Sequence, residues 1–145
     1  MWRLPTWLVN QVAMRVYRVV SEELARRDMH KHHFAILCAL NEFGGSSQAL
    51  LGRRLGIDRS DVVAPLDELE QRGLVRRTQG KGDRRRNTVD LKSRGRRELA
   101  HLEARVDDAQ QQIFGVLSRS ERDRLQRSRT RVLEHQTPWR PPPER

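Results

Sequence analysis

Positive charge gathers around two glycines near the middle of the chain. Between Gly80 and residue 86 stand four basic side chains, namely Lys81, Arg84, Arg85 and Arg86. Guanidinium and ammonium groups bind phosphate oxygens, and arginine also enters a narrow DNA minor groove, where negative potential is concentrated. An acid, Asp83, stands inside this basic cluster and would repel a polyanion, so we expect it to orient a neighbouring cation. The alternative is a solvated loop with no dedicated partner.

The overall charge also favours a polyanionic partner. The chain has 145 residues with 29 Lys and Arg against 19 Asp and Glu, which gives a net charge of +10. Nucleic acid and an anionic membrane surface both fit that charge. We find no targeting segment and no apolar run of about 18 residues that would span a membrane. The single cysteine, Cys38, excludes an intrachain disulfide and fits a reducing interior, so we expect a cytoplasmic protein.

Helical periodicity dominates the first half of the chain. Apolar residues recur at helical spacing over residues 7–27, 31–43 and 59–72, with a shorter helix starting after Ser47. Gly56 ends that short helix, and Asp58 is a suitable N-cap for the next one. Two short helices joined by a glycine-containing turn are typical of a helix-turn-helix.

The period changes from helical to alternating after Gly73. Residues 74–79 and 87–91 each predict a strand, and the basic loop lies between them. A β-hairpin that directly follows a helix-turn-helix predicts a winged helix. We therefore expect a mainly α fold with a small β-hairpin wing, an α+β chain.

Long charged helices close the chain. Residues 93–116 and 119–134 predict two charged helices with a thin apolar line. Such helices are expected to bury little within one chain, so we interpret the line as a seam to the first helix and to a second subunit. The proline-rich end is expected to be disordered. The predicted organisation is an N-terminal dimerisation helix, a winged helix-turn-helix domain, C-terminal dimerisation helices and a tail, over residues 1–30, 31–92, 93–135 and 136–145.

Three stretches resemble the MarR family of winged-helix transcriptional regulators. Residues 47–60 resemble its helix-turn-helix, residues 69–75 resemble the exit of its recognition helix, and Asp83, Arg85, Val89 and Leu91 match its wing pattern. The resemblance covers roughly residues 8–135. It implies a homodimer, most commonly a repressor, that binds a pseudo-palindromic operator in double-stranded DNA. It also implies release of the DNA by a small-molecule or oxidant signal.

A recognition helix reads base edges from its N-terminal residues. The residues expected to do so are Arg59, Ser60, Asp61, Val63 and Ala64. Asp61 is also explained as a first-turn acid that the helix dipole favours, and we prefer that interpretation.

Two further features belong to this part of the prediction, one before the recognition helix and one inside it. Ser47 and Gln48 begin the preceding helix, where free N–H groups bind phosphate. Pro65 lies inside the recognition helix, so either the helix bends there or its predicted boundary is wrong; we expect a bend.

In the wing, the resemblance makes Arg85 the first choice for insertion into the minor groove. Lys81, Arg84 and Arg86 would then hold flanking phosphates. Asp83 would orient Arg85. These roles divide the basic cluster into one arginine that probes the groove and three cations that position it.

The resemblance places an effector where the first helices meet the dimerisation helices. Candidate contacts for a small aromatic or phenolic ligand are Trp7, Arg15, His32, His33 and Asn41. Surface exposure of the arginine and dimer packing of the tryptophan explain those residues equally well. The histidines at 30–33 lack a matching Cys or Asp set, so we expect a helix-capping or pocket role and no metal or cofactor.

Other function classes have less support. The chain shows no phosphate-binding glycine motif and no nucleophile with an evident base, so we do not expect an enzyme. Cys38 lies on an apolar stripe and is expected to be inert, although an oxidant-sensing repressor is an alternative. A non-specific architectural nucleic-acid-binding protein and a basic scaffold or membrane-surface binder are the remaining alternatives.

Overall fold

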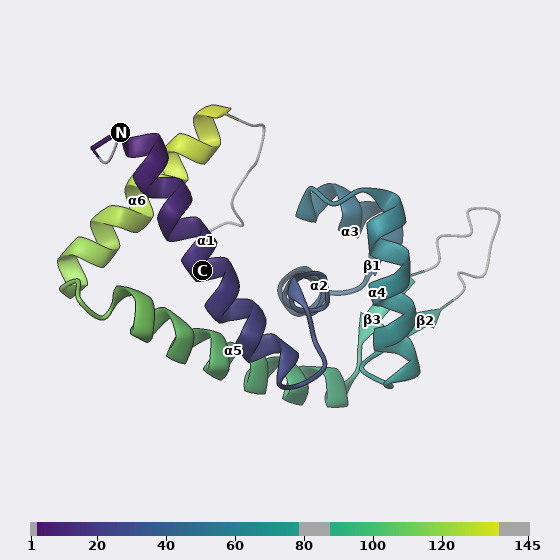
Figure 1. Cartoon of the computed structure of the whole chain (residues 1–145). Coiled ribbons are helices and arrows are strands. Elements are labelled where there is room, and N and C mark those ends of the chain that lie inside the picture. Colours follow the sequence, from purple (N-terminus) through teal and green to yellow (C-terminus); the bar gives the residue numbers. More distant parts are fainter. Residues whose placement is uncertain (1–2, 79–87, 137–145) are drawn as a thin grey trace. The chain divides into compact units, whose positions relative to one another are not determined.

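The computed structural model describes residues 3–78 and 88–136, with the backbone alone at Arg59 and Gln136 (Figure 1). This part of the chain forms six helices and three short strands. The chain divides into two compact units, and the boundary along the chain lies between Ala109 and Gln110. In chain order the elements are α1 (Pro5–Ala25), α2 (Lys31–Phe43), β1 (Ser46–Ser47), α3 (Gln48–Leu55), α4 (Arg59–Gln71), β2 (Val75–Thr78), β3 (Thr88–Leu91), α5 (Ser93–Phe114) and α6 (Arg119–Gln136).

Local signals set the bounds of the first two helices. Pro5 opens α1, because its fixed φ angle suits the first helical position and its missing N–H is not needed there. His30 is the N-cap of α2, and its Nδ1 accepts a hydrogen bond from the His32 N–H at 3.2 Å. The His33 Nδ1 accepts from the His30 N–H, also at 3.2 Å, which completes a capping box. The predicted capping role for this histidine cluster is confirmed.

The predicted helix-turn-helix is present as α3 and α4. Ser47 caps α3 by accepting a hydrogen bond from the Leu50 N–H at 3.2 Å. Gly56 ends α3 with φ +62°, a left-handed conformation that glycine adopts without strain. The turn then leads into α4, which starts at Arg59 as expected.

α4 continues without interruption from Arg59 through Gln71, with Pro65 inside it (Figure 1). The alternative that the helix boundary was misplaced at this proline is therefore wrong. Pro65 is buried together with Val62, Leu66 and Leu69, and these last three have no exposed surface. Burial of this apolar face holds the helix against the core, which offsets the cost of the missing hydrogen bond to the Asp61 carbonyl.

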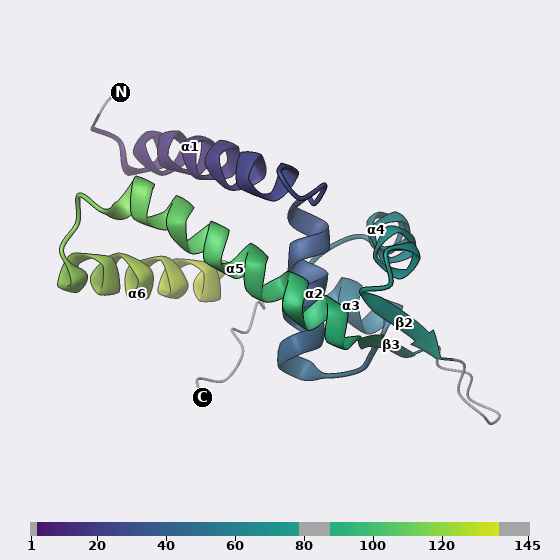
Figure 2. The same ribbon diagram turned by 90° about the horizontal axis from the view of Figure 1, so that it is seen from below.

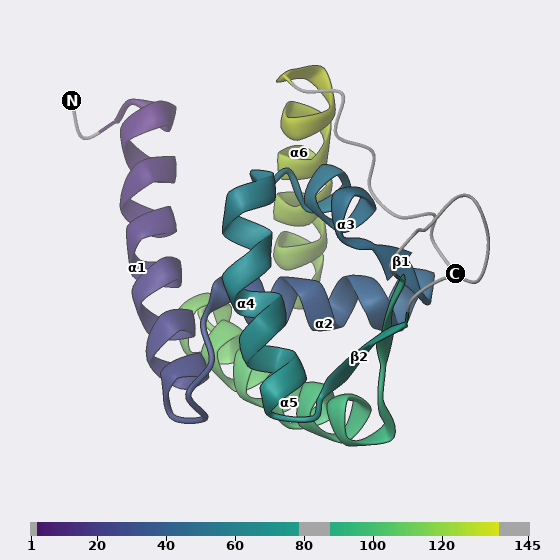
Figure 3. The same ribbon diagram turned by 90° about the vertical axis from the view of Figure 1, so that its right-hand side faces the viewer.

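The sheet has one strand more than the sequence indicated. Its strand order is β1-β3-β2, and both pairings are antiparallel. The predicted hairpin is formed by β2 and β3, with Val75 opposite Leu91 and Thr78 opposite Thr88. The unpredicted β1 has two residues, too few to show an alternating pattern. Figure 3 shows β2 beside the C-terminal half of α4.

The core of the first unit lies among α2, α3, α4, the sheet, the first half of α5 and Leu24 near the end of α1. Leu99 and Leu102 of α5 are buried in it, at 2% and 0% exposure. The expectation that the charged C-terminal helices bury little within one chain is therefore wrong for this half of α5. An ion pair between Arg105 and Glu23 at 3.0 Å also joins α5 to α1, which supports the predicted seam between these helices.

The second unit contains the end of α5 and the whole of α6 (Figure 2). Ser118 caps α6, because its hydroxyl accepts a hydrogen bond from the Glu121 N–H at 3.4 Å and the Glu121 carboxylate accepts one from the Ser118 N–H at 2.8 Å. Arg122 donates to the Gln111 side chain at 2.8 Å and so connects the two helices. The apolar residues near the end of α6 stay exposed, with Val132 at 61% and Leu133 at 49%.

Candidate nucleic-acid interface

One side of α4 is turned away from the core and carries four of the five residues predicted to read DNA. Ser60, Asp61, Val63 and Ala64 are all exposed, and Val63 is a 40% exposed aliphatic side chain. The alternation with the buried Val62 and its neighbours follows from the helical period, which places the two sets on opposite faces. Arg59 belongs to the first turn of the same helix, and its side chain lies outside the described residues.

The starts of both helices offer backbone N–H groups. In α3 the Ser47 hydroxyl accepts from the Leu50 N–H, and Gln48 follows at the first helical position, half-buried. In α4 the N-cap Asp58 makes no side-chain capping hydrogen bond. The first N–H groups of a helix have no partner inside the helix, so they suit an anion such as a phosphate.

Two cations of α3 were not singled out from the sequence. Arg53 and Arg54 occupy its last turn and are exposed. The Arg54 guanidinium lies 4.4 Å from the centre of the Phe43 ring and donates to the Ser46 hydroxyl at 2.9 Å. The helix dipole favours basic residues at a helix C-terminus. The sequence alone therefore gives no sign of a further role for these two arginines.

The wing hairpin is present up to its last described residues, Thr78 and Thr88, which face each other across the sheet. The predicted DNA contacts Lys81, Arg84, Arg85 and Arg86, and the orienting Asp83, lie outside the described residues. Their roles therefore stay predictions. The described strands do establish where the wing begins, beside α4.

Arg77 of β2 is the main residue that the sequence analysis missed. Its guanidinium contacts Asp67 Oδ1 through Nη2 and Glu70 Oε2 through Nη1, each at 2.6 Å. Its backbone N–H donates to the other Glu70 oxygen at 2.9 Å. These contacts join the wing strand to α4, and we call the three residues the Arg77 clamp.

The electrostatics of the Arg77 clamp agree with its geometry. The pKa of Glu70 is lowered, first by the hydrogen bond from the Arg77 backbone and next by the one from its side chain. Burial acts to lower the pKa of Arg77, but the hydrogen bonds to Glu70 and Asp67 outweigh it, so that pKa is raised. Glu70 and Arg77 therefore both stay ionised at neutral pH.

A second contact joins α4 to α2. His33 has 1% exposure, and its Nε2 lies 2.8 Å from Glu68 Oε2 in a short contact that is not aligned well enough for a hydrogen bond. Burial lowers the pKa of His33 to about 4, so the imidazole is neutral at pH 7. Its Nδ1 accepts from the His30 N–H, which places the ring proton on Nε2, facing the carboxylate.

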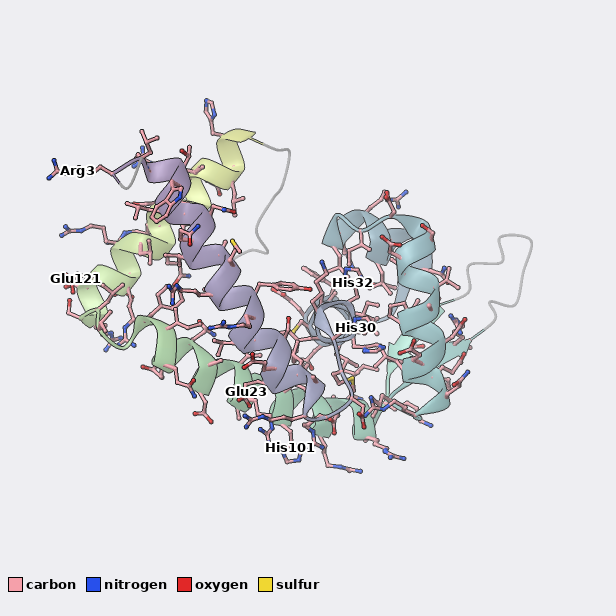
Figure 4. The ribbon with its side chains drawn as sticks, in the orientation of Figure 1. Arg3, Glu23, His30, His32, His101 and Glu121 are labelled. Atoms are coloured by element: carbon pink, nitrogen blue, oxygen red, sulfur yellow. The ribbon has the colours of Figure 1, made fainter. Side chains whose placement is uncertain are left out.

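His30, His33 and Glu68 bring ligand-type atoms within 4.8 Å of one another (Figure 4 labels His30). The capping bonds act against a metal ion there. Both Nδ1 atoms accept from backbone N–H groups, so both Nε2 atoms carry the proton that a metal would have to displace. The positive charge of Arg72 also acts on His33. The arrangement suits a helix cap that contacts α4 better than it suits a metal centre.

The predicted effector residues come from two helices. Trp7 is half-buried and Arg15 is exposed, both on α1, while His32 is half-buried and Asn41 exposed on α2. Trp7 stands near the start of α1, whereas His32 lies in the first turn of α2. Their joint role in effector binding stays a prediction. Figure 4 shows His32 at the start of α2, next to His30.

Cys38 has the surroundings of an unreactive thiol. It is half-buried on α2, and burial, followed by the charges of Glu103 and Glu42, raises its pKa to about 12. Little thiolate forms at neutral pH, and the thiolate is the nucleophile in oxidation and exchange. The structure agrees with the expectation that this cysteine is inert.

No helix in the described part of the chain is long and apolar enough to cross a membrane. The described residues instead form two short helices at a sharp turn, followed by a hairpin with an exposed α4 face beside it. That combination defines a winged helix-turn-helix protein.

Comparison with known proteins agrees with this class. A family model described as MarR family matches residues 27–86. The transcriptional repressor CouR bound to a 23-mer DNA duplex is 29% identical, with a TM-score of 0.81 over 90% of this chain and 92% of that one. CouR from Rhodococcus jostii RHA1 bound to p-coumaroyl-CoA is 28% identical, with a TM-score of 0.74 over 88% and 90%. Wild-type MarR from E. coli, at 24% identity, TM-score 0.75 and coverage of 90% and 97%, shares the fold.

Residues 27–86 match the MarR family model, and the chain is similar in fold to solved regulators of that family over about nine-tenths of its length. Its class is a DNA-binding transcriptional regulator and not an enzyme. The resemblance drawn from residues 47–60, 69–75 and the wing pattern is therefore confirmed.

Proposed function

We propose that the protein is a homodimeric repressor that binds a pseudo-palindromic operator in cytoplasmic DNA and is released by a small aromatic ligand. The observation that carries the DNA-binding part is the exposed face of α4, with Ser60, Asp61, Val63 and Ala64, beside the start of α3 and the wing hairpin. The likeness to CouR, a repressor bound to a DNA duplex, supports the same role.

Each part of the interface has a distinct task in this proposal. The exposed α4 residues enter the major groove, with Arg59 on guanine or a phosphate and Val63 against a thymine methyl. Ser47 and Gln48 at the start of α3 bind a phosphate of the flanking backbone. In the wing, Arg85 enters the minor groove, Asp83 orients it, and Lys81, Arg84 and Arg86 hold phosphates.

Dimerisation through the terminal helices is supported by the apolar surface of α1. Leu8, Val12 and Tyr17 are 46%, 44% and 59% exposed, and Val9 and Met14 are more exposed still. A helix of a monomeric protein seldom leaves this much apolar surface in water. A second copy of the chain is the simplest cover for it, because a two-fold dimer presents two DNA-reading helices to a palindromic site.

An aromatic effector is supported by CouR, which was solved with p-coumaroyl-CoA. In the proposal a carboxylate or phenolate pairs with Arg15, and Trp7 stacks on the aromatic ring. His32 and Asn41 then serve a ligand that reaches the start or the end of α2. His33 is fully buried and capped, so it acts through its neighbours rather than by direct ligand contact.

Selection of DNA fragments from a random pool, followed by affinity measurements at two salt concentrations, tests the proposal. We expect enrichment of one pseudo-palindromic sequence, a steep loss of affinity with salt, and a retained preference over random duplex. Repeating the selection with a panel of phenolic and lipophilic ligands tests release. Equal affinity for all sequences would instead favour an architectural protein.

A further inference from the structure

The recognition helix carries an unusual amount of negative charge for an element that approaches DNA. Its sequence includes four acids, Asp61, Asp67, Glu68 and Glu70, against the single cation Arg59. Carboxylates beside a phosphate backbone weaken binding. Two of the four, Asp67 and Glu70, are paired with Arg77, and Glu68 contacts the neutral His33.

Arg77 lies between β2 and α4, where it can fix the position of the strand relative to the helix as well as neutralise charge. In β2 the side chain of Arg77 is half-buried on the same face as the buried Val75, while Arg76 and Thr78 are exposed. That face lies against α4, since Arg77 reaches Asp67 and Glu70 there. Thr78, one residue further along, is the last described residue of β2 before the wing loop.

Glu70 is the more constraining of the two acids. One of its oxygens accepts from the Arg77 backbone N–H at 2.9 Å and the other from the Arg77 guanidinium at 2.6 Å. A backbone contact fixes the main chain of β2, which a side-chain ion pair alone does not do. Glu70 and Arg77 are only 38% and 25% exposed, so these charge-assisted bonds are partly shielded from water.

We propose that the Arg77 clamp sets the position of the wing hairpin relative to the recognition helix. Asp67, Glu70 and Arg77 are then positioning residues for operator recognition, acting through the geometry of β2 and α4. The inference rests on the proposed function, since it assumes that α4 and the wing bind one DNA site together. In this proposal Asp67 and Glu70 raise affinity for the operator through their contacts, although their negative charge alone predicts that they lower it.

Two matched substitutions, one in α4 and one at its N-cap, test this sign. Glu70→Gln and Asp58→Asn each replace one carboxylate with an amide, and Asp58 makes no side-chain capping bond. The probes are the duplex that the wild-type protein selects from a random pool and a random-sequence duplex of equal length. On charge alone, both variants would bind both probes as tightly as the wild type or more tightly.

The proposal expects Glu70→Gln to lower affinity for the selected duplex by about tenfold, as when a specific contact is lost, while affinity for random duplex is kept or rises. Asp58→Asn should bind both probes at least as tightly as the wild type. Asp67→Asn, which removes one ion pair and keeps the backbone contact, should show a smaller loss in the same direction. Melting temperatures of all three variants identify any folding defect.

A Glu70→Gln variant that follows Asp58→Asn on both probes would overturn the proposal. So would equal losses on both probes, because these indicate a smaller folded fraction rather than a displaced wing. If Glu70→Gln does not fold, Asp67→Asn decides by the same two comparisons. Failure of the wild-type protein to prefer any sequence would refute the proposed function itself, and the inference with it.

Discussion

His33 shows at the scale of one residue how a buried titratable group ties stability to pH. Its imidazole is 1% exposed, accepts the His30 N–H and faces the Glu68 carboxylate. Burial is the first cause that lowers its pKa to about 4, against 6.5 for an ordinary histidine, and the charge of His30 acts in the same direction. Protonation thus favours the unfolded chain.

We predict that folding stability is lost as pH falls from about 6.5 toward 4, because the unfolded chain takes up a proton that folded His33 resists. Above pH 6.5 both states leave this group neutral and its contribution is constant. Urea unfolding at pH 7.5, 6.5, 5.5 and 4.5 measures the effect. His33→Gln should flatten the profile, whereas His101→Gln, at an exposed position of α5, should leave it unchanged. A His33→Gln profile as steep as that of the wild type would refute the assignment.

The prediction for Arg85 also belongs to the scale of one residue. If Arg85 enters the minor groove, Arg85→Ala should weaken binding to the selected duplex by about 1–3 kcal/mol, as for other specific contacts. A fluorescence anisotropy titration measures it, with Arg140→Ala in the C-terminal segment as a control of equal charge. Unchanged affinity would place the wing off the DNA.

At the scale of the element, helices were predicted more accurately than contacts. The period of apolar residues and the Ser47, Gly56 and Asp58 signals located α3 and α4 closely, because a helix is specified by residues near one another in the chain. The two-residue β1 was not predicted, because its pairing with β3 depends on residues about 40 positions away. The Arg77 clamp and the contact of His33 with Glu68 were not predicted for the same reason, because no local sequence pattern indicates which distant side chains come into contact.

The cap of α3 gives a prediction at this scale. Ser47→Ala removes the acceptor for the Leu50 N–H and should cost about 1 kcal/mol of folding stability. Thermal unfolding measures the loss. Ser128→Ala, at an exposed position within α6, is the matched control and should leave stability nearly unchanged. A Ser47→Ala variant as stable as this control would show that the cap contributes little.

At the scale of the whole molecule, the terminal helices keep apolar surface that a single chain does not cover. The first unit buries the start of α5 in its core, yet α1 keeps an exposed apolar face and α6 keeps Val132 and Leu133 in water. The sequence predicted the charged helices but not this division, because burial depends on which chain, the same or a second one, covers each face. The proposed homodimer supplies that cover.

Val12 of α1 and Gln71 of α4 offer a matched test of the dimer. Val12 belongs to the exposed apolar surface of α1, whereas Gln71 is exposed at the end of α4, outside the terminal helices. Val12→Glu should dissociate the dimer, because each protomer would bury an unpaired carboxylate. Gln71→Glu adds the same charge and should leave the dimer intact. Sedimentation velocity measures both, and a wild-type protein that sediments as a monomer would refute the dimer outright.

Glu70 has one more consequence, which concerns the outer boundary of the sheet. β2 is an edge strand, since the strand order is β1-β3-β2. Unpaired N–H groups on an edge strand are a template on which a strand of another molecule can add, and extended addition leads to aggregation. Glu70 occupies the Arg77 N–H with a charged group. The contact that fixes the wing strand thereby also protects this edge of the sheet against association with other chains.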